Sequence, residues 1–219
     1  MPNKYYPVYL DLEKRDCIVI GSNHEAITKI AGLLESKAKV TVIAPRLGPK
    51  LKTFADDGVI KWIPRNYEYG DLEGCFLVIV ADTSDTETNL KVTWEANQHN
   101  VICNVMDVTH MCSFIAPAIA RRGEIALAVS TGGASPALAR KFREALSESA
   151  ILEWADIAPL LADVRKELKT RHMRIAPDWW QQCLTEELLS TYQSGNYAQA
   201  RENLIAALIS KNPSVSESL

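Results

Sequence analysis

The chain has 219 residues, 47% of them hydrophobic and 23% charged, with a formal net charge of −3. This length is enough for one large domain or two smaller ones, and the composition is that of an ordinary soluble globular protein. Slight acidity argues against a nucleic-acid partner, which normally meets a basic surface. The sequence shows neither a signal peptide nor an apolar run of about 18 residues, so we expect a cytoplasmic protein without a membrane span.

The five cysteines lie mostly inside apolar runs and form no CxxC pair. Such cysteines are typical of reduced, buried thiols in a cytosolic protein. One group, formed by Cys103, His110 and Cys112, matches no structural zinc spacing. The sequence therefore predicts no metal site.

The first half of the chain alternates strand-like and helix-like segments. Apolar runs predict strands at 17–20, 40–44, 60–63, 75–81 and 101–105, after a β-prone opening at 5–10. Helical spacing predicts helices at 24–38, 50–57 and 85–97. This alternation indicates an α/β fold with a parallel sheet and right-handed crossovers.

The pattern changes after Asp107. Two β-like runs, 114–120 and 125–129, flank Arg121–Gly123 and predict an antiparallel hairpin. A glycine-rich loop leads to a helix at 136–147, and further helices are expected at 157–168, 179–192 and 197–209. We therefore divide the chain into residues 1–113, 114–150 and 151–211, followed by a disordered polar tail at 212–219.

A turn at Gly21 follows the first strand and opens the first helix. The dinucleotide fingerprint G-x-G-x-x-G/A is represented by Gly21, Asn23 and Ala26. Asn23 places a side chain where a pyrophosphate would lie, although asparagine tolerates positive φ and so permits the turn. On spacing alone, a turn that binds a dinucleotide and a turn that has lost its ligand are equally favoured.

The end of the second predicted strand lacks the acidic residue that would bind an adenosine ribose. Pro45 and Arg46 stand there instead. The guanidinium of Arg46 would suit the 2′-phosphate of NADP, and a simple solvated charge is the alternative.

Two more segments carry candidate chemistry. Asp107 follows the fifth predicted strand, where open α/β sheets place ligands; it would act as a general base or cap the next turn. The loop from Ser130 to Pro136 would bind carboxylates through backbone amides, or serve only as a tight connection.

Several separated segments share one order and spacing: 6–12, 17–26, 40–45, Thr83 with Asn89, 104–107, 112–118 and 128–140. Together they resemble the precorrin-2 dehydrogenase and sirohydrochlorin ferrochelatase family of sirohaem synthesis. The resemblance extends over about residues 5–148, and its last two segments are the most specific.

The resemblance implies a Rossmann-like NAD-binding domain, a β-hairpin dimerisation segment shared in a homodimer, and an α-helical C-terminal domain. It also implies oxidation of the tetrapyrrole precorrin-2 to sirohydrochlorin with NAD+; some members then insert Fe2+. The family's key carboxylate falls on Asp107. Nucleotide contacts fall on Gly21, Ser22, Asn23, His24, Glu25, Pro45, Arg46 and Thr83. Substrate contacts are expected at Asn104, Ser113, Ser130, Thr131, Gly132 and Ser135.

The sequence departs from the family at the first turn. The family shows three glycines, any residue, then Val-Ala, whereas this chain has Ser22 and Asn23 in place of two glycines and Glu25 in place of the valine. A chelatase without the redox step and a non-catalytic tetrapyrrole-binding protein are therefore alternatives to the dehydrogenase.

Overall fold

The chain forms two compact units in this computed structural model, which describes residues 5–210. Unit 1 contains the described residues up to Ala116 together with Thr131–Ser135, and unit 2 contains Pro117–Ser130 and the described residues from Pro136 onward. The hairpin segment and the C-terminal helices therefore lie in one unit. The expected division, with boundaries at 113 and 150, placed them in two separate domains. The expected tail at 212–219 lies outside the described residues.

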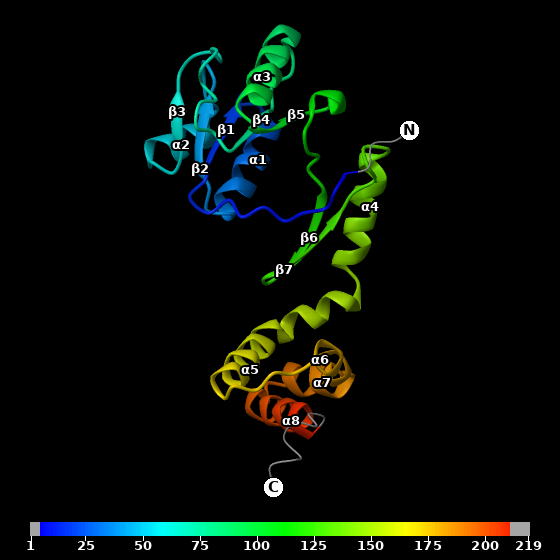
Figure 1. Cartoon of the computed structure of the whole chain (residues 1–219). Coiled ribbons are helices and arrows are strands. Elements are labelled where there is room, and N and C mark those ends of the chain that lie inside the picture. The colour runs from blue at the N-terminus through cyan, green and yellow to red at the C-terminus, as the bar shows by residue number, and fades with distance from the viewer. Residues whose placement is uncertain (1–4, 211–219) are drawn as a thin grey trace. The chain divides into compact units, whose positions relative to one another are not determined.

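Unit 1 is built on a five-stranded parallel sheet with the strand order β3-β2-β1-β4-β5 (Figure 1). Its strands are β1 (Asp16–Ile20), β2 (Lys39–Ile43), β3 (Lys61–Ile63), β4 (Leu77–Val80) and β5 (Ile102–Val105). Each lies within one of the predicted apolar runs or differs from it by one residue, and all four residues of β4 are buried. Because the order reverses between β1 and β4, the carboxyl ends of these two strands flank the crevice where such sheets bind ligands.

Helices cover both faces of this sheet. On one face, α1 (His24–Glu35) and α2 (Pro49–Asp56) pack against side chains such as Val19 and Val42. On the other, α3 (Thr86–Gln98) packs against side chains such as Ile20 and Val80. The strands alternate their side chains between two apolar layers, so the Rossmann-like α/β prediction is confirmed.

The β-prone opening at 5–10 forms no strand. Tyr6 and Tyr9 are largely exposed, and Pro7 lacks the backbone donor that a sheet ladder needs. The β-prone opening was therefore wrongly expected to form a strand, because residues 5–10 pair with no strand of the sheet.

The hairpin of unit 2 pairs β6 (Ala118–Arg122) with β7 (Ile125–Val129). The first strand begins four residues later than predicted, just after Pro117. Arg122 pairs with Ile125, so the turn consists of Gly123 and Glu124, with φ of +56° at the glycine. As expected, α4 (Pro136–Ser147) begins at its proline.

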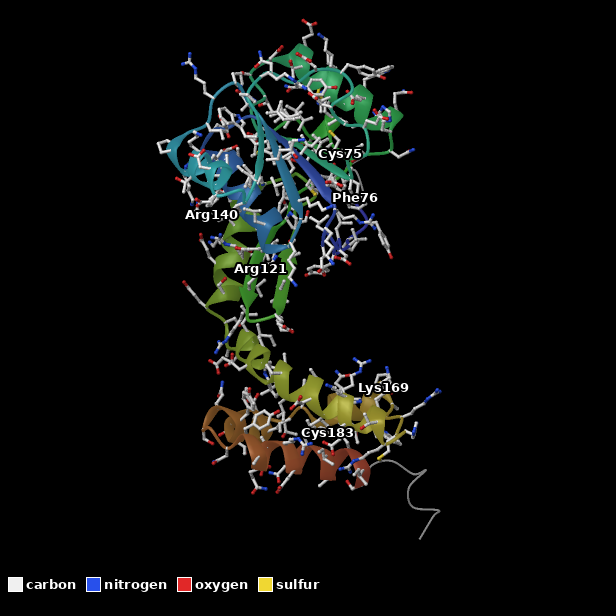
Figure 2. The ribbon with its side chains drawn as sticks, turned by 90° about the vertical axis from the view of Figure 1, so that its left-hand side faces the viewer. Cys75, Phe76, Arg121, Arg140, Lys169 and Cys183 are labelled. Carbon is white, nitrogen blue, oxygen red and sulfur yellow. The ribbon has the colours of Figure 1, made fainter. Side chains whose placement is uncertain are left out.

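Helices make up the rest of unit 2: the 3-10 helix η2 (Ala150–Ile157), α5 (Ala158–Thr170), α6 (Pro177–Cys183), α7 (Glu186–Gln193) and α8 (Tyr197–Ser210). Their core includes Leu160, Val164 and Cys183, the last of which is labelled in Figure 2. The single helix predicted at 179–192 was wrong. The chain breaks at Leu184, and the Thr185 hydroxyl caps α7 by accepting the amide of Leu188.

All five cysteines are free thiols, as the sequence predicted. Burial raises the pKa of Cys75, at the entry to β4, to about 12. Beside it, the ring of Phe76 lies 4.9 Å from the guanidinium of Arg15 (Figure 2). Within residues 5–210, no helix is both long enough and apolar enough to cross a membrane.

Candidate functional site

Gly21 forms the turn between β1 and α1. Its φ is +101°, a conformation that residues with a Cβ rarely adopt. A Cβ at Gly21 would lie 2.6 Å from the Cβ of Asp82, which follows β4, and 2.7 Å from its backbone nitrogen. The first glycine of the fingerprint is therefore required twice, by the turn itself and by the close approach of the neighbouring strand end.

Asn23 is the N-cap of α1, and both amide atoms of its side chain bond to the protein. Its Oδ1 accepts the amide of Ala26 at 2.9 Å, while its Nδ2 donates to the carbonyl of Ala81 at 2.8 Å. The backbone of Asn23 has φ of −68°, so the positive φ considered from the sequence is not needed. Both amide atoms of Asn23 are therefore bonded to backbone, although the residue itself is exposed; that its side chain lies at the pyrophosphate position stays a prediction.

The first turn of α1 presents backbone amides at the carboxyl edge of the sheet. The cap engages the third residue of the helix, Ala26, so the amides of His24 and Glu25 precede the first intrahelical hydrogen bonds. Both side chains are exposed. A helix N-terminus of this kind attracts anions through its amides and its dipole.

The ends of β2 and β1 are linked by hydrogen bonds. The Ser22 hydroxyl donates to the carbonyl of Arg46 at 2.7 Å, and the amide of Gly21 donates to Ile43 at 3.0 Å. Pro45 and Arg46 are exposed at this edge. The expected ribose-binding segment therefore lies directly beside the phosphate turn.

The loop after β4 is ordered by its own side chains. The buried Asn89 donates through Nδ2 to the carbonyl of Thr83 at 3.1 Å. The carboxylate of Asp82 accepts the Ser84 hydroxyl at 2.7 Å. Thr83 is thus held at the same edge as Gly21. Asp82 was not among the residues predicted from the sequence; its position directly after the longest apolar run was the available signal.

Asp107 lies beyond the end of β5, two residues after Val105, and is exposed with φ of +61°. The short helix η1 (Thr109–Met111) follows it. Asparagine and aspartate tolerate this left-handed conformation better than most residues. The structure therefore places this carboxylate at the carboxyl edge of the sheet, as predicted.

The segment after η1 returns along β5 and fixes the Asp107 loop. The Cys112 sulfur accepts the amide of Val105 at 3.3 Å and donates to its carbonyl at 3.2 Å. The Ser113 hydroxyl accepts the amide of Cys103 at 2.8 Å. Asn104 is buried and donates to the carbonyl of Phe114 at 3.0 Å. The thiol that the sequence analysis weighed as a metal ligand is thus engaged with backbone, and residues 5–210 contain no group of three metal-binding side chains.

The segment Thr131–Ser135 belongs to unit 1 although its neighbours along the chain do not. A Cβ at Gly133 would lie 3.6 Å from the Cγ2 of Thr109 in η1. The Thr131 hydroxyl accepts the amide of Ser135 at 3.1 Å and closes the loop. Unit 1 therefore brings this loop to the segment that follows Asp107, whereas Ser130 belongs to unit 2.

A parallel sheet with a switch point, a glycine turn and an open helix N-terminus defines a dinucleotide-binding unit. The glycine turn and the amides of His24 and Glu25, which precede the first intrahelical hydrogen bonds, lie at this switch point, so the residues present fit such a cofactor.

Comparison with known proteins agrees with this class. Residues 8–118 match a family model described as "Putative NAD(P)-binding", and residues 122–149 match one described as "Sirohaem biosynthesis protein central". The first match covers about half of the chain, and the chain belongs to this NAD(P)-binding family.

The chain is similar to siroheme synthases. It is 32% identical to that of Thioalkalivibrio sulfidiphilus over 93% of this chain and 42% of the relative. It is 33% identical to that of Nitrosococcus oceani over 94% of this chain and 44% of the relative. The chain thus spans less than half the length of these curated relatives.

Among solved structures, the chain is similar to SirC, a precorrin-2 dehydrogenase. The two share 26% sequence identity with a TM-score of 0.69, over 93% of this chain and 98% of SirC. This similarity includes both units, and it supports the predicted fold class throughout.

Proposed function

We propose that this chain is a precorrin-2 dehydrogenase of sirohaem biosynthesis, which oxidises precorrin-2 to sirohydrochlorin. The observation that carries the proposal is the similarity to SirC over nearly the whole of both chains. The matches to siroheme synthases and to the central sirohaem model support the same pathway.

The cofactor site of the proposal is the carboxyl edge of unit 1. Gly21, Ser22, Asn23, His24 and Glu25 supply the turn and helix N-terminus for the pyrophosphate, with Pro45 and Arg46 beside the ribose and Thr83 at the adjoining strand end. NAD+, when bound there, accepts a hydride from the tetrapyrrole. Asn23 acts by holding the turn, because both of its amide atoms are bonded to backbone.

Asp107 serves as the general base. Oxidation of precorrin-2 removes two hydrogens, one as hydride and one as a proton, and the exposed carboxylate of Asp107 takes the proton and passes it to solvent. The loop beneath it is tied to β5 through Cys112 and Ser113. This fastening limits the positions that the carboxylate can occupy.

Substrate binding is assigned to two segments. One is the glycine-rich loop at 130–135, which approaches η1, and the other is the end of β5 with the residues that follow it. Ser130, Thr131, Gly132 and Ser135 of the glycine-rich loop would contact the tetrapyrrole, and the bond between the Thr131 hydroxyl and the Ser135 amide would hold the loop in shape. Asn104 and Ser113 contribute by shaping the Asp107 loop, since their side chains bond to the backbone next to it.

Anaerobic incubation of the purified chain with precorrin-2 and NAD+, followed by sirohydrochlorin absorbance, tests the activity. Asp107→Asn is the appropriate variant because asparagine also tolerates a φ near +60°. We expect a loss of at least about a hundredfold in kcat with the fold intact. Asp57→Asn, at the C-terminal end of α2, is the matched control and should keep wild-type activity. No NAD+-dependent product from the wild type would refute the proposal.

The proposal includes a homodimer formed through unit 2. A two-stranded hairpin alone is marginally stable in water, and Ile119, Ile125 and Phe142 are exposed on the hairpin and α4. Sedimentation should give twice the chain mass for the wild type, and Phe142→Asp should shift the equilibrium towards monomer. A monomeric wild type would contradict this part of the proposal.

Insertion of Fe2+ into sirohydrochlorin is the second activity to test, with the metal as substrate. Metal insertion without nucleotide, in the absence of any dehydrogenation, would select the chelatase alternative. Tight tetrapyrrole binding with neither reaction would select the non-catalytic alternative. Both amide atoms of Asn23 are bonded to backbone and so cannot swing freely across the phosphate turn, which argues against both alternatives.

A further inference from the structure

The segment that connects β2 to α2 carries positive rather than negative charge. From Ala44 to Lys50 the sequence is Ala-Pro-Arg-Leu-Gly-Pro-Lys, with two cations and no carboxylate. In dinucleotide-binding folds an acidic residue at this place binds the ribose 2′-hydroxyl, whereas an arginine accommodates a 2′-phosphate.

Hydrogen bonds fix this segment on both sides. The Ser22 hydroxyl binds the carbonyl of Arg46, which ties the segment to the phosphate turn. The indole Nε1 of Trp62 donates to the carbonyl of Ala44 at 2.9 Å, which ties it to β3. The side chain of Arg46 therefore starts from an ordered backbone position at the ribose end of the site.

The guanidinium of Arg46 is available for a ligand. Arg46 is exposed, and it has no ion-pair partner within the part of the chain that the structure describes. By contrast, Lys52 pairs with Asp56, and Arg65 binds Asp71 at 2.7 Å.

A second anion-attracting feature adjoins Arg46. Helix α2 begins at Pro49, and its N-cap, Gly48, provides no side-chain cap. The N-terminus of α2 therefore keeps its dipole and amides unscreened by a capping side chain. Lys50 lies exposed in the same first turn. Arg46, Lys50 and this helix end together favour a phosphate dianion over a neutral hydroxyl.

We propose that Arg46, with the first turn of α2, binds the 2′-phosphate of NADP+, so that this site accepts NADP+ at least as tightly as NAD+. The inference rests on the nucleotide site of the proposed function and names its cofactor range. It assigns to Arg46 a role in specificity, whereas the phosphate turn serves both cofactors.

Binding titrations with NAD+, NADP+, 5′-AMP and 2′-AMP test this role without any turnover. For the wild type we expect a Kd for NADP+ no weaker than that for NAD+, and tighter binding of 2′-AMP than of 5′-AMP. Arg46→Ala should weaken NADP+ by about tenfold and leave NAD+ within about twofold, because only one charge-assisted contact is lost. Arg46→Glu should reverse the preference in favour of NAD+.

Lys61→Ala is the matched control. It removes one exposed cation at the start of β3, level with Thr41 in the middle of β2 rather than at the strand ends, and should change neither Kd. Wild-type binding of NAD+ more than threefold tighter than NADP+, or an equal loss of both cofactors in Arg46→Ala, would overturn the inference while leaving the dehydrogenase intact. Binding of neither dinucleotide would overturn the nucleotide site itself, and the proposed function with it.

Discussion

Replacing Asn23 by alanine should destabilise the protein by about 1–2 kcal/mol. The change removes the N-cap acceptor of Ala26, a loss that costs about 1 kcal/mol. It also removes the donor to Ala81, which contributes about 1 kcal/mol or less at this partly buried position. Asn23→Ser keeps the cap and loses only the Ala81 bond, so about half of the effect should remain.

Urea denaturation gives the free energy of unfolding, and hydrogen exchange at the Ala26 amide reports the cap directly. Asn23→Gly should leave nucleotide affinity within about threefold, since both amide atoms of the removed side chain are bonded to backbone. Asn23→Ala within 0.3 kcal/mol of wild type, or nucleotide binding about tenfold tighter in Asn23→Gly, would refute this reasoning.

Three further changes test other parts of unit 1. Gly21→Ala should cost at least about 2 kcal/mol in thermal unfolding, because its φ is +101° and its Cβ would meet Asp82. Gly32→Ala, in α1 with nothing within 4 Å, should instead stabilise by about 0.5–1 kcal/mol. Tyr67→Phe should cost about 1–3 kcal/mol in the same measurement, because the hydroxyl donates to the fully buried Glu95; a loss below 0.5 kcal/mol would contradict that role. Finally, thiol reagents at pH 8 should label the buried Cys17 and Cys103 only on unfolding, since burial raises the pKa of both thiols to about 11. Fast labelling of the native protein would refute their burial.

Much of unit 1 could be predicted from the sequence because each strand is a continuous apolar run. A strand buried on both faces needs no partner information to be recognised, and β1, β2 and β4 are of this kind. The break between α6 and α7 was missed because Trp180, Leu184 and Leu188 keep a helical spacing through it. There, the capping hydroxyl of Thr185 decided the outcome.

The places of the candidate residues at the strand ends could be predicted from the sequence, whereas the bonds of their side chains could not. Asp107 lies at the expected edge of the sheet, and its left-handed backbone suits an aspartate. By contrast, the pattern of residues did not show that the Cys112 thiol bonds to Val105. Such contacts join residues at spacings that no helix or strand periodicity predicts. They become visible only when the folded conformation of the loop is known.

The phosphate turn shows why the glycine fingerprint understates this site. Its first glycine answers two requirements that a Cβ cannot meet, a positive φ and contact with Asp82. The next fingerprint position requires only that no side chain stand between the backbone and the pyrophosphate. Asn23 bonds its amide to the helix cap and to Ala81, with an ordinary φ of −68°. These bonds fix the new side chain, so replacement of this glycine is compatible with the proposed nucleotide site.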